Sequence, residues 1–287
     1  MSHVRSWLAN PWARARFLWV VAVAYLAWTL LPVIIAVLFS FNATRSLTSW
    51  QGFSTQWYAG NVNSVWDDPV LRAALFQSLK LAGLTVLIAV PLGVAFALAL
   101  DRWQGRGAGP ANFLMLFSFI TPEVAIGIAL LLFFTQLAVG IGLGFTAQLA
   151  GLSMYMMAYS VIVVRARLLS IGHEYEEAAM DLGASPVGAL RRVMLPLLSP
   201  AIFASAAIVF AASLDNFVIS QQLSKDASTQ TIPILIYSSA RTGPLPSLNA
   251  LASLTLVAST LVIGLALVVY RRASREQRRP ALTRTVA

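Results

Sequence analysis

Two carboxylates lie inside long apolar stretches of this sequence, Glu123 in one and Asp215 in another. An acidic side chain within a membrane is costly and usually faces a polar cavity or a partner. Asn216 follows Asp215 directly, and Gln222 comes seven residues later, on about the same face of a continuous helix. Acidic and amide groups with no arginine beside them suit a cationic solute. We therefore predict a substrate path that contains Glu123, Asp215, Asn216 and Gln222.

Basic residues offer one alternative and one exclusion. Lys80, near the end of another apolar stretch, could pair with either carboxylate and make it purely structural. Neither Lys80 nor Lys225 follows a glycine, as a P-loop lysine does, so we do not expect this chain to hydrolyse ATP by that route. There is no cysteine, and His3 and His173 are far apart, so we expect no metal site or bound cofactor. No hydrolase motif appears in the apolar stretches, and the chain is predicted not to be an enzyme.

A polar, helix-forming segment separates two strongly apolar ones. It reads Glu177-Ala178-Ala179-Met180-Asp181-Leu182-Gly183, and Val193-Met194-Leu195-Pro196 follows after nine residues. The small residues Ala178 and Ala179 would let a helix pack closely against a partner. Glu177 could hold the segment by a hydrogen bond or meet a basic group on that partner.

The end of this segment carries signals for a turn between two helices. Gly183 can end a helix and turn the chain at low steric cost. Ser185 and Pro186 are typical of the cap and the first position of a second helix. The sequence thus predicts two short helices in a loop of about 169–200.

Six apolar stretches are long enough to cross a membrane, which takes roughly 20 residues. They must be helices, because lipid cannot satisfy free backbone polar groups. Interior prolines at 32, 91 and 122 predict kinks. We expect an all-α membrane protein in which residues 17–270 form one six-helix unit. The predicted spans are about 17–41, 76–100, 111–135, 146–168, 201–223 and 249–270.

Composition supports a membrane protein and gives no support to nucleic-acid binding. Apolar residues make up 58% of the chain and charged residues 11%, whereas a soluble domain carries about a quarter charged residues. The net charge of +9 is spread between and beyond the apolar stretches, not gathered on one face. We therefore predict a lipid environment and no nucleic-acid partner.

The basic residues also predict the orientation. With both termini inside, 15 of the 20 lysines and arginines fall on the inner side, which is the side that such residues favour. Residues 1–16 then read as an interfacial segment on the cytoplasmic surface. Residues 271–287 read as a basic, disordered cytoplasmic tail. The inner basic residues are Arg5, Arg14, Arg16, Arg102, Arg106, Arg165, Arg167, Arg191, Arg192 and arginines 271, 272, 275, 278, 279 and 284.

The outer loop of about 42–75 is rich in aromatic residues. Trp57 and Tyr58 are our candidates for contact with an external binding protein. An aromatic belt at the boundary between lipid and water is the alternative.

The polar segment resembles the EAA loop of bacterial ABC importer permeases. That loop has the pattern E-A-A, three residues, G, nine residues, I-x-L-P, and only Val193 departs from it here. The resemblance implies short cytoplasmic helices that dock on a separate ATPase subunit, which would bind ATP and magnesium. The residues that it assigns to ATPase coupling are Glu177, Ala178, Ala179, Asp181, Gly183 and Pro196.

Other segments are similar to spermidine/putrescine permeases of the PotC and PotI kind. They are Trp50–Tyr58, Thr121–Glu123, Ser213–Ser220, Ile232–Ser238 and Ser247–Ala252. This resemblance implies a six-helix type I importer permease in a bacterial inner membrane, moving polyamines inward. It also implies a second permease, with a heterodimer favoured, two ATPases and an external binding protein.

Two departures leave other solutes open. Asn216 replaces the second aspartate of the family pattern, and Leu223-Ser224-Lys225-Asp226 replaces a run of small residues. Ferric iron, thiamine or phosphonates are alternative cargoes for the same type of complex. An ion-coupled secondary transporter is a further alternative, although no clear internal repeat of the kind common in such carriers is present.

Overall fold

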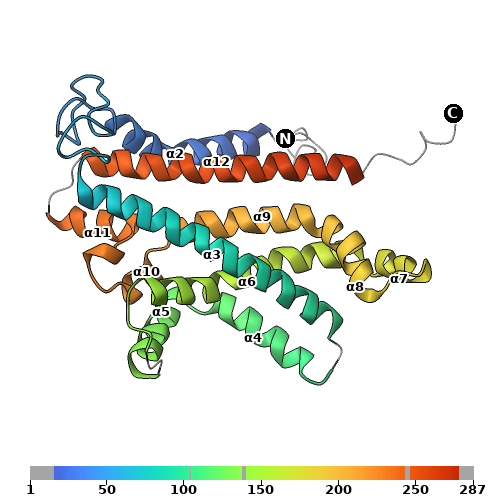
Figure 1. The fold of residues 1–287 in the computed structure, drawn as a ribbon. Helices are drawn as coiled ribbons and strands as arrows, with labels where there is room; N and C mark the ends of the chain where they lie inside the picture. Colours follow the sequence, from blue (N-terminus) through green and yellow to red (C-terminus); the bar gives the residue numbers. More distant parts are fainter. Residues whose placement is uncertain (1–15, 104, 138–139, 243–245, 278–287) are drawn as a thin grey trace, which may run out of the picture.

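The computed structural model describes residues 16–103, 105–137, 140–242 and 246–277, whose regular secondary structure is helical, with no strand. The long helices run roughly side by side, and the short helices α7 and α8 form one end of the molecule (Figure 1). The helices are α2 (Arg16–Phe39), α3 (Pro69–Arg102), α4 (Ala108–Ile120), α5 (Glu123–Leu132), α6 (Phe145–Ile171), α7 (Glu174–Asp181), α8 (Pro186–Ala189), α9 (Leu195–Leu214), α10 (Val218–Leu223), α11 (Ile232–Thr242) and α12 (Pro246–Gln277).

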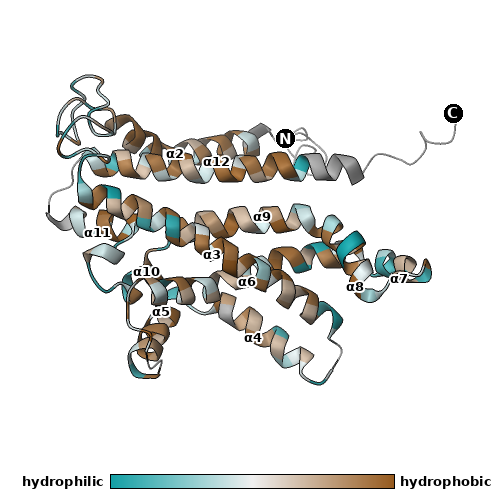
Figure 2. Ribbon diagram, viewed as in Figure 1, coloured by the Kyte–Doolittle hydropathy of each residue, from teal (hydrophilic) through white to brown (hydrophobic). Residues whose placement is uncertain are grey.

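Five helices among the described residues are long and apolar enough to cross a membrane. Hydrophobic residues dominate α2 and α12, whereas hydrophilic residues gather around α7 and α8 (Figure 2). The all-α membrane fold is therefore confirmed. The predicted span 111–135 is not one helix, because Pro122 cannot donate a backbone hydrogen bond and the helix is divided into α4 and α5.

The predicted span 201–223 and the predicted loop 169–200 also differ from the structure. Helix α9 ends at Leu214, and α10 starts only at Val218. At the other end, a helical segment runs from Pro186 without interruption to Leu214, through a π turn at Leu190–Met194. Much of the expected loop is thus the first part of the fourth of the five long helices.

Helices α3, α6 and α9 form the centre of the bundle. Leu81, Leu152 and Leu198, one from each helix, are among its fully buried side chains. Gly93 of α3 lies where α6 comes closest, and the Ser160 hydroxyl bonds Val90 O at 3.4 Å and Ser205 Oγ at 3.3 Å. Helix α2 lies at the edge of the bundle along α12 (Figure 1).

The two predicted terminal segments lie partly outside the described residues. The interfacial segment 1–16 falls there, except for Arg16, which begins α2. Helix α12 continues to Gln277, so the disorder expected for the tail does not hold for residues 271–277, whereas its boundary as a cytoplasmic tail at 271 stays a prediction. Residues 278–287 lie outside the described part of the chain.

We expect Gly93→Val to lower the stability of the bundle relative to Gly83→Val. A Cβ at position 93 would lie 2.5 Å from Ser160 Cβ, whereas one at position 83 meets nothing within 4 Å. Overpacking of this kind costs roughly 1–3 kcal/mol. Thermal unfolding of both purified variants in detergent measures the difference. Equal midpoints would show that α3 and α6 do not need this close approach.

Candidate functional site

A cavity of 480 Å³ lies where α5, α6, α9 and α10 meet. Two carboxylates, Glu123 and Asp215, line it, and none of its described lining residues is basic. Tyr155 and Tyr159 of α6 add two aromatic rings. The other lining residues are Met156, Ala211, Ala212, Asn216, Phe217 and Val218. The cavity is thus negative, with aromatic and apolar walls.

Two helix breaks create this cavity. Asp215 caps the C-terminus of α9, and Glu123 is the first residue of α5, directly after Pro122. Interrupted helices at membrane depth are tolerated where the freed backbone lines a cavity or is buried in protein. The position of Glu123 is favourable, because the N-terminus of a helix attracts negative charge. Both carboxylates therefore lie at points where a span changes direction.

Asn216 connects the two breaks. Its amide nitrogen donates a hydrogen bond to Glu123 Oε1, and its amide oxygen accepts from the backbone N–H of Ser220 at 3.2 Å. The Asn216 side chain is only 6% exposed. A neutral amide at this position therefore satisfies the Glu123 carboxylate without adding a charge.

Three of the four predicted path residues line this one cavity, and Gln222 does not. The prediction for Gln222 assumed a continuous helix, but the break at 215–217 changes the phase between Asp215 and Gln222. The Gln222 side chain packs beside Gly127 of α5 instead. The roles of the other three remain a prediction.

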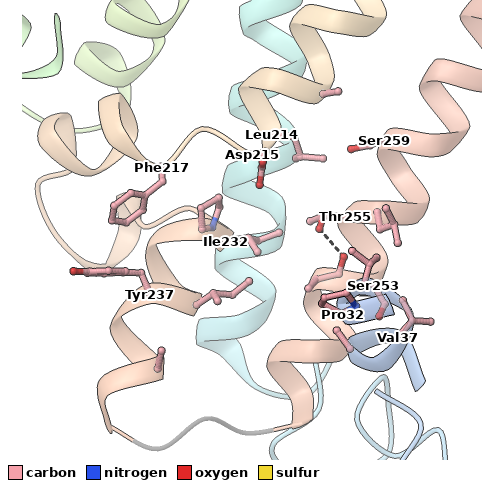
Figure 3. A pocket seen from close by; sticks show the side chains of 18 residues that line it. Pro32, Val37, Leu214, Asp215, Phe217, Ile232, Tyr237, Ser253, Thr255 and Ser259 are labelled. Carbon is pink, nitrogen blue, oxygen red and sulfur yellow. Dashed lines mark hydrogen bonds between the residues drawn. The ribbon is translucent and has the colours of Figure 1, made fainter. Parts of the chain in front are cut away.

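Asp215 also borders an apolar cleft of 940 Å³ (Figure 3). It is formed by residues of α2, α9, α11 and α12, and Asp215 is the charged residue among those that line it. Asp215 and Phe217 border both spaces. The Asp215 carboxylate can therefore be approached from two sides.

The alternative of a structural pair with Lys80 finds no support. The Lys80 ammonium lies 4.2 Å from the centre of the Phe145 ring, a cation–π contact. The ion pairs within the described residues do not include Lys80, Glu123 or Asp215.

Gln148 of α6 is a positioning residue that the sequence analysis missed. It is 0% exposed, and its amide nitrogen donates to the carbonyls of Ser220 and Thr229, both at 2.9 Å. Its oxygen accepts from Gln77 of α3 at 3.2 Å. Gln148 thereby holds α10, which carries one side of the cavity, against α6. A lone amide within an apolar stretch was the available signal.

The second candidate site is the surface formed by α7 and α8. Ser185 caps α8 by accepting from Gly188 N at 3.2 Å, and Gly183 turns the chain with φ +86°, as the sequence predicted. Leu182 is 91% exposed, and Tyr175 and Val187 are also exposed. Large apolar side chains in a polar segment indicate a contact surface for a partner.

The predicted coupling residues lie on or near this surface. Glu177, Ala178, Asp181 and Gly183 are exposed, and Ala179 is half-buried. Pro196 is exposed in the first turn of α9. The sequence analysis did not find Glu176, which is buried against Arg102 at the end of α3.

The prediction that Trp57 contacts an external protein is wrong. Its side chain is 2% exposed, and its indole N–H donates to Asn42 O at 2.6 Å. It packs with Leu71 of α3 and Leu251 of α12, so it is part of a core and not of a surface. Tyr58 is half-buried, and its hydroxyl bonds Ser40 Oγ at 2.7 Å, so its contact stays a prediction.

The segment around Trp57 is held by further polar contacts. Hydrogen bonds from the Ser64 hydroxyl and from Gly60 N–H hold the pKa of Asp67 below its usual value. A charged Asp67 thus closes the loop before α3. Trp50, Phe53 and Trp66 are the exposed aromatic residues of this segment.

A family model described as "Binding-protein-dependent transport system inner membrane component" matches residues 89–275. The chain belongs to this family. It is therefore a membrane subunit of a transport system, and its polar segment lies within the matched region.

Two permeases of known transport systems are similar to this chain over most of its length. The putrescine transport system permease protein PotI of Escherichia coli (strain K12) is 34% identical over 267 residues, which cover 90% of this chain and 93% of PotI. The spermidine/putrescine transport system permease protein PotC of the same strain is 35% identical over 240 residues, covering 84% and 88%.

A solved structure has the same fold. It is a chain from a bacterial ABC transporter involved in the import of the acidic polysaccharide alginate. The TM-score is 0.70 over 90% of this chain and 96% of that one, at 16% identity. The fold is therefore that of an ABC importer membrane subunit.

We expect Gln148→Met to loosen α10 more than Gln77→Met does. The first change leaves two buried carbonyls without a donor, and each unsatisfied group costs about 1–3 kcal/mol. The second removes only the contact to the Gln148 oxygen. Hydrogen exchange of residues 218–229 in the two purified variants compares them. Equal protection of that segment would contradict the role given to Gln148.

Proposed function

We propose that this chain is the permease subunit of an ATP-driven importer for polyamines such as putrescine and spermidine. The observation that carries the proposal is the cavity with two carboxylates, two tyrosine rings and no basic residue among the described ones that line it. An alkyl chain with ammonium groups matches it, because carboxylates attract the charges and apolar walls accept the methylenes. The printed names of the relatives PotI and PotC support the same substrate class.

The neutral Asn216 amide fits this proposal. It leaves two acidic groups in the cavity, which match a substrate with two positive charges. The Asn216 amide donates to the Glu123 oxygen that an ammonium would meet. An arriving cation would replace this bond, in which only the acceptor is charged, with one in which both partners are charged.

The distribution of charge supports an orientation with α7 and α8 in the cytoplasm. Arg102, Arg191 and Arg192 lie at that end of the bundle, close to the α7–α8 turn. Positively charged loops favour the cytoplasmic side of a membrane. Helix α2 begins and α12 ends toward the same end (Figure 1), so both termini would be cytoplasmic. Helix α11 and the segment before α3 would then face the binding protein outside.

The exposed surface of α7 and α8 is proposed as the docking site of the ATPase. Leu182 and Val187 would enter an apolar groove, and the small Ala178 would permit close approach. Because one helical segment continues from Pro186 to Leu214, a displacement of α8 would reach the break at Asp215. The partner would bind ATP and magnesium, and this chain would transmit the resulting movement to its membrane helices.

The proposed complex contains two ATPases, an external binding protein and a second homologous permease, with a heterodimer favoured. The side chains of α2 are exposed along the window that is apolar enough to cross a membrane. Such a surface suits lipid or the second permease.

Uptake of labelled putrescine and spermidine tests the proposed substrate. Cells that lack this gene and any other polyamine importer should lose uptake and regain it with the wild-type gene. No change on deletion in that background would overturn the polyamine assignment.

Asp215→Asn should lower uptake by about 10-fold or more, because a hydrogen bond to a charged group is worth about 1.5–3 kcal/mol. Asp226→Asn is the matched control, since it removes the same charge from a loop outside the cavity. Asparagine also caps well, so the turn that Asp226 caps should persist. Equal uptake by the two variants would show that Asp215 is not part of the substrate path.

Gly183→Val should impair ATPase binding, whereas Gly183→Asn should be tolerated. Position 183 has a positive φ that asparagine adopts far more readily than a β-branched residue does. A Cβ there meets nothing within 4 Å, so backbone strain is the only change. Co-purification of the ATPase with each variant measures the effect. A valine variant that retains the ATPase fully would argue against the docking site.

A further inference from the structure

Helix α7 is joined to the bundle by an ion pair that spans 74 residues of sequence. The Arg102 guanidinium, at the end of α3, donates to both Glu176 carboxylate oxygens at 2.6 and 2.7 Å. Glu176 is only 9% exposed, although α7 is otherwise a surface helix. Both contacts come from one guanidinium nitrogen, Nη2, and a charge-assisted hydrogen bond is about twice as strong as a neutral one.

A second contact lies beside the first. His173 Nε2, one residue before α7, is 3.8 Å from Asp101 Oδ2, the neighbour of Arg102. Successive residues of α3 thus meet the start and the first turn of α7. This arrangement resists rotation of α7 about a single point.

The two chain connections of α7 are glycine turns. Gly172 before it has φ +76°, and Gly183 after it has φ +86°. A Cβ at either position meets nothing within 4 Å, so neither turn is packed in place. The chain on both sides of α7 is therefore a weak mechanical link. The contact with α3 supplies a stiffer connection to the bundle, in addition to the packing of α7 on α8 and the π turn.

Helix α3 continues from this contact to the far side of the substrate cavity. Ser78 Oγ accepts from the backbone N–H of Ile232, at the start of α11, at 2.8 Å. Gln77 donates to Gln148, which holds α10. One continuous helix therefore connects α7 to both helices that follow the break at Asp215.

We propose that Arg102 and Glu176 form a strut that passes the motion of α7 into α3. They are positioning residues for coupled transport and do not touch the solute. The strut is a second route to the cavity, parallel to the continuous segment from α8 to α9. This inference rests on the proposed docking of an ATPase on α7.

A charge swap tests the strut. Arg102→Glu and Glu176→Arg would each place two like charges together, and the double variant would restore an opposite pair in reverse order. Each variant is reconstituted with the ATPase and binding protein in vesicles, and putrescine uptake and ATP hydrolysis are measured together. We expect each single variant to lower solute moved per ATP at least tenfold. The double variant should recover to within threefold of wild type.

Two results would overturn the strut. One is normal uptake per ATP in the single variants. The other is a double variant that is monodisperse and binds the ATPase but does not recover. If the wild-type chain itself fails to bind the ATPase, the docking proposal fails instead, and that result is seen before any variant is made.

Cross-linking keeps the test decisive if the single variants do not fold. The chain has no cysteine, so Arg102→Cys and Glu176→Cys together introduce the only two thiols. A flexible bis-maleimide that spans the replaced ion pair would join α7 to α3 covalently. We expect the cross-linked complex to keep transporting, because the two elements move as one unit. Loss of transport on cross-linking, with the unlinked double cysteine variant active, would show that the contact must open.

Discussion

A backbone amide or carbonyl inside a lipid bilayer must find a partner within the protein, and the architecture around the cavity follows from this constraint. The chain interrupts two apolar segments, at Pro122 and at Asp215, and brings the interruptions together. Asn216 then joins one break to the other, and Gln148 bonds the carbonyls of Ser220 and Thr229, which follow the second break in the sequence. The same arrangement that satisfies the backbone places two carboxylates at one cavity. The residues that stabilise the helix breaks therefore also form the candidate site.

Much of this molecule could be predicted from its sequence, because lipid leaves few choices. Long apolar runs must be helices, Gly183 and Ser185 carry local turn and cap signals, and the polar segment between two spans stands out by composition. The break at Asp215 could not be predicted in the same way. No proline or glycine marks it, and a polar pair can equally lie within a continuous helix, so Gln222 was assigned to the wrong face. Trp57 was misplaced for another reason, since its burial depends on α3 and α12, which are distant in sequence.

The two ends of the bundle differ in the kind of interaction that holds them. At the α7–α8 end, glycine turns flank α7, and the ion pair of Arg102 and Glu176 joins it to α3. At the α11 end, neutral amides and hydroxyls such as Gln148 and Ser78 form short, directional contacts in buried surroundings. Buried neutral bonds are costly to leave unmade. In the proposed function, a partner would displace the α7–α8 end, while the neutral contacts at the α11 end would hold their positions.

The position of α2 has a consequence for how the protein is made. Its main contact with the rest of the bundle is α12, and every other described helix lies between the two in sequence. While the chain is being inserted, α2 therefore waits in lipid without its neighbour, which is tolerable because lipid tails are as apolar as its own side chains. The bundle closes only when α12 enters the membrane. The insertion of α12 is thus the step at which α2 gains its main packing partner. If synthesis stops before α12 is made, α2 is left without that contact to the core.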